Sequence, residues 1–173
     1  LRNPAPVPCP LPETGHNTNM TATLRSSGTT AAVIVTHKRA DLLAHSLDQV
    51  VSQTHPVDWV IVVDNGVQDE VRRLLDDLAA ERAVYLPSNT NLGGAGGFAY
   101  GFLHALALGA DAIWCADDDG RPKDEHVLKE LYRVAEKHQL AEVSPVVANI
   151  DDPEKLAFPL RQGTTWHRRV DEL

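Results

Sequence analysis

Three consecutive aspartates, Asp117, Asp118 and Asp119, followed by Gly120, are the residues of this sequence best suited to chemistry. Each close pair of carboxylates costs roughly 1–4 kcal/mol at effective dielectrics between those of water and a protein surface. A hard divalent cation such as Mn²⁺ or Mg²⁺ removes this cost, because it prefers carboxylate oxygens. We therefore expect Asp117 and Asp119 to hold such a cation, with positions left open for the oxygens of a diphosphate. The alternative is a solvated acidic turn that caps the next helix.

A glycine-rich loop is the second candidate site, and it contains Asn91, Gly93 and Gly94 just before a predicted helix. Glycines let a ligand approach the backbone closely, and a helix start offers unpaired N–H groups. Gly94, Gly96 and Ala99 also fit the G-x-G-x-x-A pattern of dinucleotide-binding proteins, so an NAD-dependent oxidoreductase is an alternative. Against that alternative, a polar segment separates these glycines from the preceding strand, whereas a dinucleotide-binding turn needs glycine almost at once.

Two other predicted strands also end in polar residues. Asp64 closes the run WVIVVD and is suited to accept a hydrogen bond from a base or a ribose. Its alternative role is to stabilise a turn at Asn65-Gly66, a common turn dipeptide. Thr36 and Arg39 close the first predicted strand, where Thr36 has the alternative of capping the next helix.

The elements that must position these residues are short apolar runs separated by helical periodicity. The runs predict strands at residues 31–36, 59–63, 83–86, 111–116 and 143–148. Strands that alternate with helices indicate an α/β fold, a Rossmann-like and mainly parallel sheet flanked by helices. Ligands bind such sheets at the carboxyl ends of the strands, where the polar residues above converge. Cys115, inside the fourth run, is expected to be a core residue.

Composition narrows the class of function. The formal net charge of -8 argues against nucleic-acid binding, which needs clustered Lys and Arg. No apolar run of about 18 residues and no secretory pattern is present, so a cytoplasmic protein is expected. Residues 1–30 are expected to form a Pro-rich polar tail and residues 31–150 the ligand-binding domain. Residues 151–173 are expected to begin an acceptor-side segment that is cut short.

The segments AAVIVTHKR, WVIVVDNG, NLGGAGGFAYG and WCADDDG, in this order, resemble glycosyltransferase family 2 with its GT-A fold. The resemblance covers about residues 30–170. The segments ADDDG, AEVSPVVANIDDP and LAFPLRQG are most similar to the galactofuranosyltransferases that initiate galactan in arabinogalactan synthesis. The C-terminal half of such an enzyme is apparently missing from the chain.

The resemblance implies a UDP-sugar donor, and it implies roles for individual residues. Uridine contacts fall on Thr36, Arg39, Asp64 and Asn91. Ribose or diphosphate contacts fall on Asp117 and Asp118, and metal ligation falls chiefly on Asp119 with Asp117 assisting.

The reaction implied is an inverting transfer to a polyprenyl-diphosphate-linked glycan, either in the cytoplasm or peripherally at the inner face of the cell membrane. The catalytic base is expected beyond Leu173, so the chain alone is expected to be inactive. Three interpretations remain: a glycosyltransferase, an NAD-dependent oxidoreductase, and a fragment that binds nucleotide-sugar without catalysis.

Overall fold

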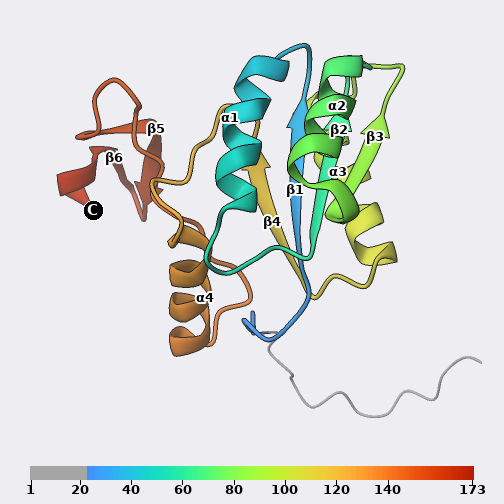
Figure 1. Ribbon diagram of the computed structural model, residues 1–173. Helices are drawn as coiled ribbons and strands as arrows, with labels where there is room; N and C mark the ends of the chain where they lie inside the picture. Colours follow the sequence, from blue (N-terminus) through green and yellow to red (C-terminus); the bar gives the residue numbers. More distant parts are fainter. Residues whose placement is uncertain (1–22) are drawn as a thin grey trace, which may run out of the picture.

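The computed structural model describes residues 23–173, and a four-stranded parallel sheet forms its centre (Figure 1). The strands lie in the order β3-β2-β1-β4, and their bounds are Thr30–Thr36 for β1, Trp59–Asp64 for β2, Ala83–Pro87 for β3 and Ala112–Asp117 for β4. The two central strands, β1 and β2, are buried along almost their whole length. Burial on both faces explains their continuous β-branched runs. The expected α/β fold is confirmed.

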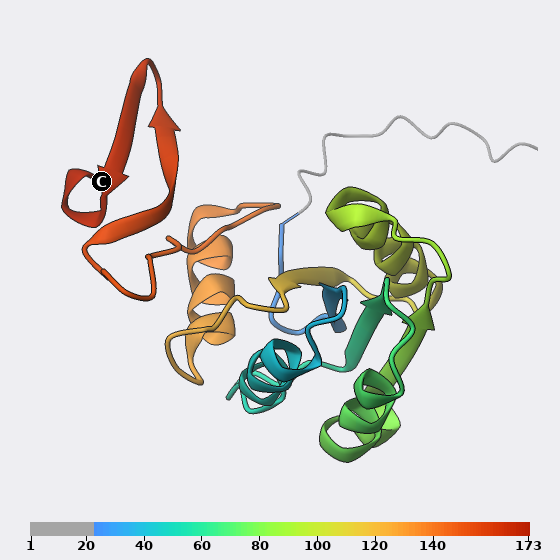
Figure 2. The same cartoon turned by 90° about the horizontal axis from the view of Figure 1, so that it is seen from above.

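Helices cover both faces of the sheet (Figure 2). Helices α1 (Ala40–Val51), α2 (Asp69–Leu78) and α4 (Val127–His138) pack on one face, where their apolar residues join those of β1 and β2. Helix α3 (Gly93–Ala107) covers β1 and β2 on the other face. A 3₁₀ turn at Ala80–Arg82 leads into β3. This arrangement leaves the carboxyl ends of the strands together at one edge of the sheet.

Helix α3 lies unusually close to the sheet because two of its glycines face the strands. A Cβ atom at Gly97 would lie 2.5 Å from Cγ1 of Val35, and one at Gly101 would lie 2.4 Å from Cγ1 of Val33. Real Cβ atoms essentially never approach so closely, so these positions accept only glycine without movement. These two glycines of the glycine-rich segment are therefore explained by packing.

The predicted strand at residues 143–148 is wrong. In this segment only Ala148 forms a bridge, to Leu156, and Val146 and Val147 are 50% and 41% exposed. A strand needs a continuous ladder with a neighbour, and this segment has none. The chain instead forms a hairpin of β5 (Lys155–Gln162) and β6 (Thr165–Arg169), which projects from the body and ends in a 3₁₀ turn at Val170–Glu172 (Figures 1 and 2).

The edges of the fold also differ from expectation. Most of the expected tail, residues 1–22, lies outside the described residues, but the N–H of Leu24 donates to the carbonyl of Leu140 and Thr30 already belongs to β1.

Cys115 is exposed and is not the core residue that the sequence predicts, because β4 is an edge strand that α3 hardly covers. Among residues 23–173 no helix has the length and apolar character needed to cross a membrane.

Candidate functional site

The three aspartates form a turn at the carboxyl end of β4. Asp117 is the last residue of the strand, and the N–H of Gly120 returns to its carbonyl oxygen at 3.2 Å. Because β4 pairs with β1, Asp117 lies opposite Val35, next to Thr36. We call residues 117–120 the acid turn. The structure thus brings the acid turn beside Thr36 and Arg39, as the sequence predicts.

Asp118 is the buried member of the acid turn, with 1% of its side chain exposed. Thr36 donates its hydroxyl hydrogen to Oδ2 of Asp118 at 2.8 Å. Oδ1 of Asp118 lies 2.6 Å from Nη2 of Arg39, in an ion pair that is not aligned as a hydrogen bond. Burial raises the pKa of the Asp118 carboxyl, and the contacts with Thr36 and Arg39 oppose this rise. Thr36 and Asp118 are therefore buried residues whose hydrogen bond holds the acid turn against the end of β1.

Asp117 and Asp119 are the exposed members of the acid turn. Arg39 donates from Nη1 to Oδ2 of Asp119 at 2.9 Å, and the Asp119 side chain is 54% exposed. Within residues 23–173, no group of three or more His, Cys, Asp or Glu side chains is arranged to hold a metal. The donors that remain are hard carboxylate oxygens, which fit Mg²⁺ or Mn²⁺. Such ions often take one or two carboxylates and complete their coordination with water and phosphate oxygens.

Ser46 positions the acid turn, and the sequence analysis missed it. This residue of α1 is fully buried, and its hydroxyl hydrogen is shared between the carbonyl oxygens of Asp117 at 2.8 Å and Gly120 at 2.9 Å. One helix thus holds both ends of the turn. The available signal was a serine on the helix face that otherwise buries Leu43, Leu47 and Val50.

Asp64 is fully buried at the end of β2, and its carboxylate accepts three hydrogen bonds from within the protein. The donors are the N–H groups of Gly66 and Gln68, at 2.8 and 2.6 Å, and the hydroxyl of Tyr85 at 2.9 Å. Burial, with this hydrogen bond and the charge of Asp64, raises the pKa of Tyr85 to about 12. These are the contacts of the turn-stabilising role. In this conformation Asp64 has no exposed surface to offer a base.

Asn65, which the sequence analysis treated only as a turn residue, ties the glycine-rich loop to β2. Its side-chain oxygen accepts from the N–H of Leu92 at 3.2 Å, and its amide nitrogen donates to the carbonyl of Gly93 at 3.4 Å. The side chain of Asn91 accepts from the N–H of Gly93 at 2.9 Å, and Gly93 has a φ of +65°. A Cβ at Gly93 or Gly94 would have no neighbour within 4 Å. Apart from the N–H of Gly93, which donates to Asn91, the start of α3 is therefore open to a ligand.

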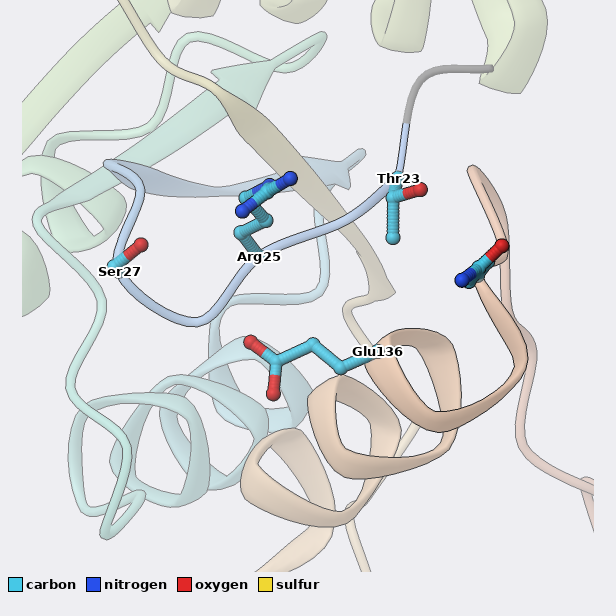
Figure 3. Close-up of a pocket in the computed structure, with 5 residues that line it drawn as sticks. Thr23, Arg25, Ser27 and Glu136 are labelled. Atoms are coloured by element: carbon cyan, nitrogen blue, oxygen red, sulfur yellow. The ribbon is translucent and has the colours of Figure 1, made fainter. Parts of the chain in front are cut away.

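A separate pocket of about 360 Å³ lies near the amino end of β1, away from the acid turn (Figure 3). Its walls come from the segment before β1 and from the end of α4: Thr23, Arg25, Ser27, Glu136 and Gln139. Glu136 accepts two hydrogen bonds from Ser26, which lower its pKa. None of the predicted site residues lines this pocket.

Comparison with known proteins identifies the family. Residues 31–171 match glycosyl transferase family 2. The chain belongs to this family. Curated relatives are the galactofuranosyltransferase GlfT1 of Mycolicibacterium smegmatis, 59% identical over 142 residues, and that of Mycobacterium tuberculosis (strain ATCC 25618 / H37Rv), 57% identical over 143 residues. The matches cover 82% of this chain and 47% of each relative, so the chain spans about half of their length.

Two solved structures share the fold of this chain. The mannosyltransferase PcManGT of Pyrobaculum calidifontis, in complex with GDP-Man and Mn²⁺, has a TM-score of 0.52 at 20% identity, over 72% of this chain and 35% of that chain. TarS of S. aureus, in complex with UDP, has a TM-score of 0.51 at 15% identity, over 72% of this chain and 43% of that chain. At such identities the likeness concerns the fold alone.

Family membership removes the NAD-dependent oxidoreductase alternative. The structure explains why the glycine pattern misleads. Gly94 and Gly96 of that pattern lie in the first turn of α3 itself, and Ser88 to Leu92 separate β3 from the start of that helix. The family 2 chain thus places its glycines for helix packing and for an open helix start.

Proposed function

We propose that this chain binds a UDP-sugar together with Mn²⁺ or Mg²⁺ and forms the donor-binding part of an inverting galactofuranosyltransferase. The observation that carries the proposal is the acid turn, whose exposed Asp117 and Asp119 stand at the carboxyl end of β4 in a family 2 chain. The 59% identity to a galactofuranosyltransferase supports UDP-galactofuranose as the donor.

In this proposal the acid turn and the start of α3 share the work of holding the donor. Asp117 and Asp119 would hold the cation, which supplies Lewis-acid support for a departing diphosphate. The N–H groups of the first turn of α3 that follow Gly93, beginning with that of Gly94, favour an anionic group through the helix dipole. Asn91 fixes the backbone at Gly93 and remains exposed beside it.

Neighbouring residues keep these donor-binding groups in place. Thr36 and Arg39 hold Asp118, and Ser46 holds the backbone on both sides of it. Asn65 ties the glycine-rich loop to β2. This preorganisation lowers the cost of ordering the site when the donor binds.

The acceptor and the cellular location extend the proposal. We also propose a polyprenyl-diphosphate-linked glycan as the acceptor, in the initiation of cell-wall galactan, as the resemblance of the sequence to galactofuranosyltransferases implies. An acceptor of this kind resides in a membrane, so the enzyme would work in the cytoplasm or peripherally at the inner membrane face.

A thermal-shift experiment tests the donor class. A ligand that binds only the folded protein stabilises it by about 2.7 kcal/mol when the ligand concentration is a hundred times its Kd. This stabilisation raises the melting temperature. We expect UDP with Mn²⁺ to raise the melting temperature and NAD to leave it unchanged. Equal shifts with NAD and UDP would contradict the proposal.

A nucleotide-sugar-binding part without catalysis of its own is the second candidate, favoured by the half-length coverage of the relatives. Both candidates predict UDP binding. Both also predict background transfer by residues 1–173 alone, so they differ in whether a longer chain that contains these residues transfers galactofuranose to a lipid-linked acceptor.

A further inference from the structure

Arg39 is the cation that the acid turn faces in this structure. Its guanidinium bridges two neighbouring carboxylates, with Nη2 at 2.6 Å from Asp118 and Nη1 at 2.9 Å from Asp119. One side chain with a single positive charge thereby bridges two members of the acid turn. Asp119 is also the residue on which the proposed function places the divalent cation.

The two ion pairs of Arg39 differ in how easily they break. Asp118 is 1% exposed, so breaking its pair would leave a buried and uncompensated charge, which is strongly unfavourable. Arg39 and Asp119 are 47% and 54% exposed, and water can replace each of them. Exposed pairs of this kind contribute little to stability. The guanidinium is therefore anchored on Asp118 and only loosely held on Asp119.

We propose that Arg39 is a built-in competitor of the divalent cation for Asp119, tethered to the site by Asp118. This inference rests on the proposed function. A cation that binds alone must displace Nη1 of Arg39 and then lies beside a positive charge. A nucleoside diphosphate brings negative charge for both the cation and the released guanidinium, so cation and nucleotide bind cooperatively.

The affinity for Mn²⁺ alone, measured by calorimetry on the full chain without nucleotide, tests the inference. Arg39→Gln removes the competitor, and the loss of one exposed pair corresponds to an affinity roughly threefold to fivefold tighter. Arg39→Lys keeps a charge for Asp118 but cannot bridge both carboxylates, so it also tightens Mn²⁺ binding. Arg73→Gln is the matched control: Arg73 is an exposed arginine paired with Glu70 on α2, and its loss leaves the Mn²⁺ affinity unchanged.

The outcomes separate this inference from the proposed function. If the wild type binds UDP in a Mn²⁺-dependent way but both Arg39 variants bind Mn²⁺ equally or more weakly, the inference is overturned and the proposed function stands. If the wild type shows no Mn²⁺ binding with or without UDP, both are overturned. If Arg39→Gln does not fold, Arg39→Lys decides alone, because it retains the charge that Asp118 requires.

Discussion

At the scale of single residues, the acid turn divides its work between buried and exposed carboxylates. Asp118 faces inward to Thr36 and Arg39, whereas Asp117 and Asp119 remain exposed. From the sequence, Asp117 and Asp119 are assigned to the cation and Asp118 to the ribose or diphosphate, but the sequence does not show which of the three is buried. Burial separates their roles, and the raised pKa of Asp118 reflects that burial first.

Asp64→Asn tests whether Asp64 stabilises the turn or contacts uracil. The amide presents hydrogens to groups that already donate to the carboxylate, so we expect the free energy of unfolding to fall by about 1–3 kcal/mol. Because Asp64 is fully buried, we also expect parallel losses of UDP and ADP affinity in competition binding. A selective loss of UDP would show that the turn opens and that Asp64 contacts the base.

Tyr85 makes stability depend on pH at the alkaline end. Its pKa is raised from 10.0 to about 12, first by burial and then by its hydrogen bond to Asp64. The folded protein holds the phenol proton more tightly than the unfolded chain does. The resulting stability is fully present below pH 10 and is lost as the pH rises through about 12.

Ultraviolet titration of tyrosinate, together with melting curves across this range, checks the prediction. Tyr85→Phe should remove the phase near pH 12 and reduce the alkaline loss of stability, and the part due to Tyr132, whose pKa burial also raises, should remain. If Tyr85 in the wild type titrates instead at the ordinary pKa of a tyrosine, the contact with Asp64 is contradicted.

At the scale of elements, the site depends on how closely α3 approaches β1. Gly101→Ala places a Cβ 2.4 Å from Val33, and overpacking of this kind typically costs about 1–3 kcal/mol. Gly94→Ala is the matched control in the same helix, because its Cβ would meet nothing within 4 Å. Chemical denaturation should show a loss for Gly101→Ala and no loss for Gly94→Ala. Equal effects would mean that close packing does not explain the glycines.

The strands show how far sequence patterns reach. The four predicted strands of the sheet agree with the structure to within one residue at each end, and the clearest signal is that of β1 and β2, which are buried and continuous β-branched runs. Val146 and Val147 belong to a similar run but have no ladder, since pairing depends on a neighbour that local sequence does not show. Ser46 and Asn65 were missed for the same reason: their partners lie far along the chain.

At the scale of the whole molecule, the chain spans about half the length of its curated relatives. Two candidate bases among the described carboxylates already have partners: Asp124 accepts from the N–H of His126, and Asp152 pairs with Lys155. General-base assistance is typically worth about 10²–10⁴ in rate. We therefore expect transfer of galactofuranose to a lipid-linked acceptor by this chain alone to remain at background. Robust transfer would contradict this and would direct attention to those carboxylates.

The central claim is that the acid turn binds a nucleoside diphosphate through a divalent cation. The most direct test is calorimetric titration of UDP into the wild type and into Asp119→Ala, each with Mn²⁺ and with EDTA. Because Asp119 is 54% exposed, its replacement should leave the melting temperature nearly unchanged. The account predicts that the wild type binds UDP with Mn²⁺ and loses most of that affinity in EDTA, whereas Asp119→Ala binds weakly in both. Equal UDP affinity of the wild type with Mn²⁺ and with EDTA would contradict the account.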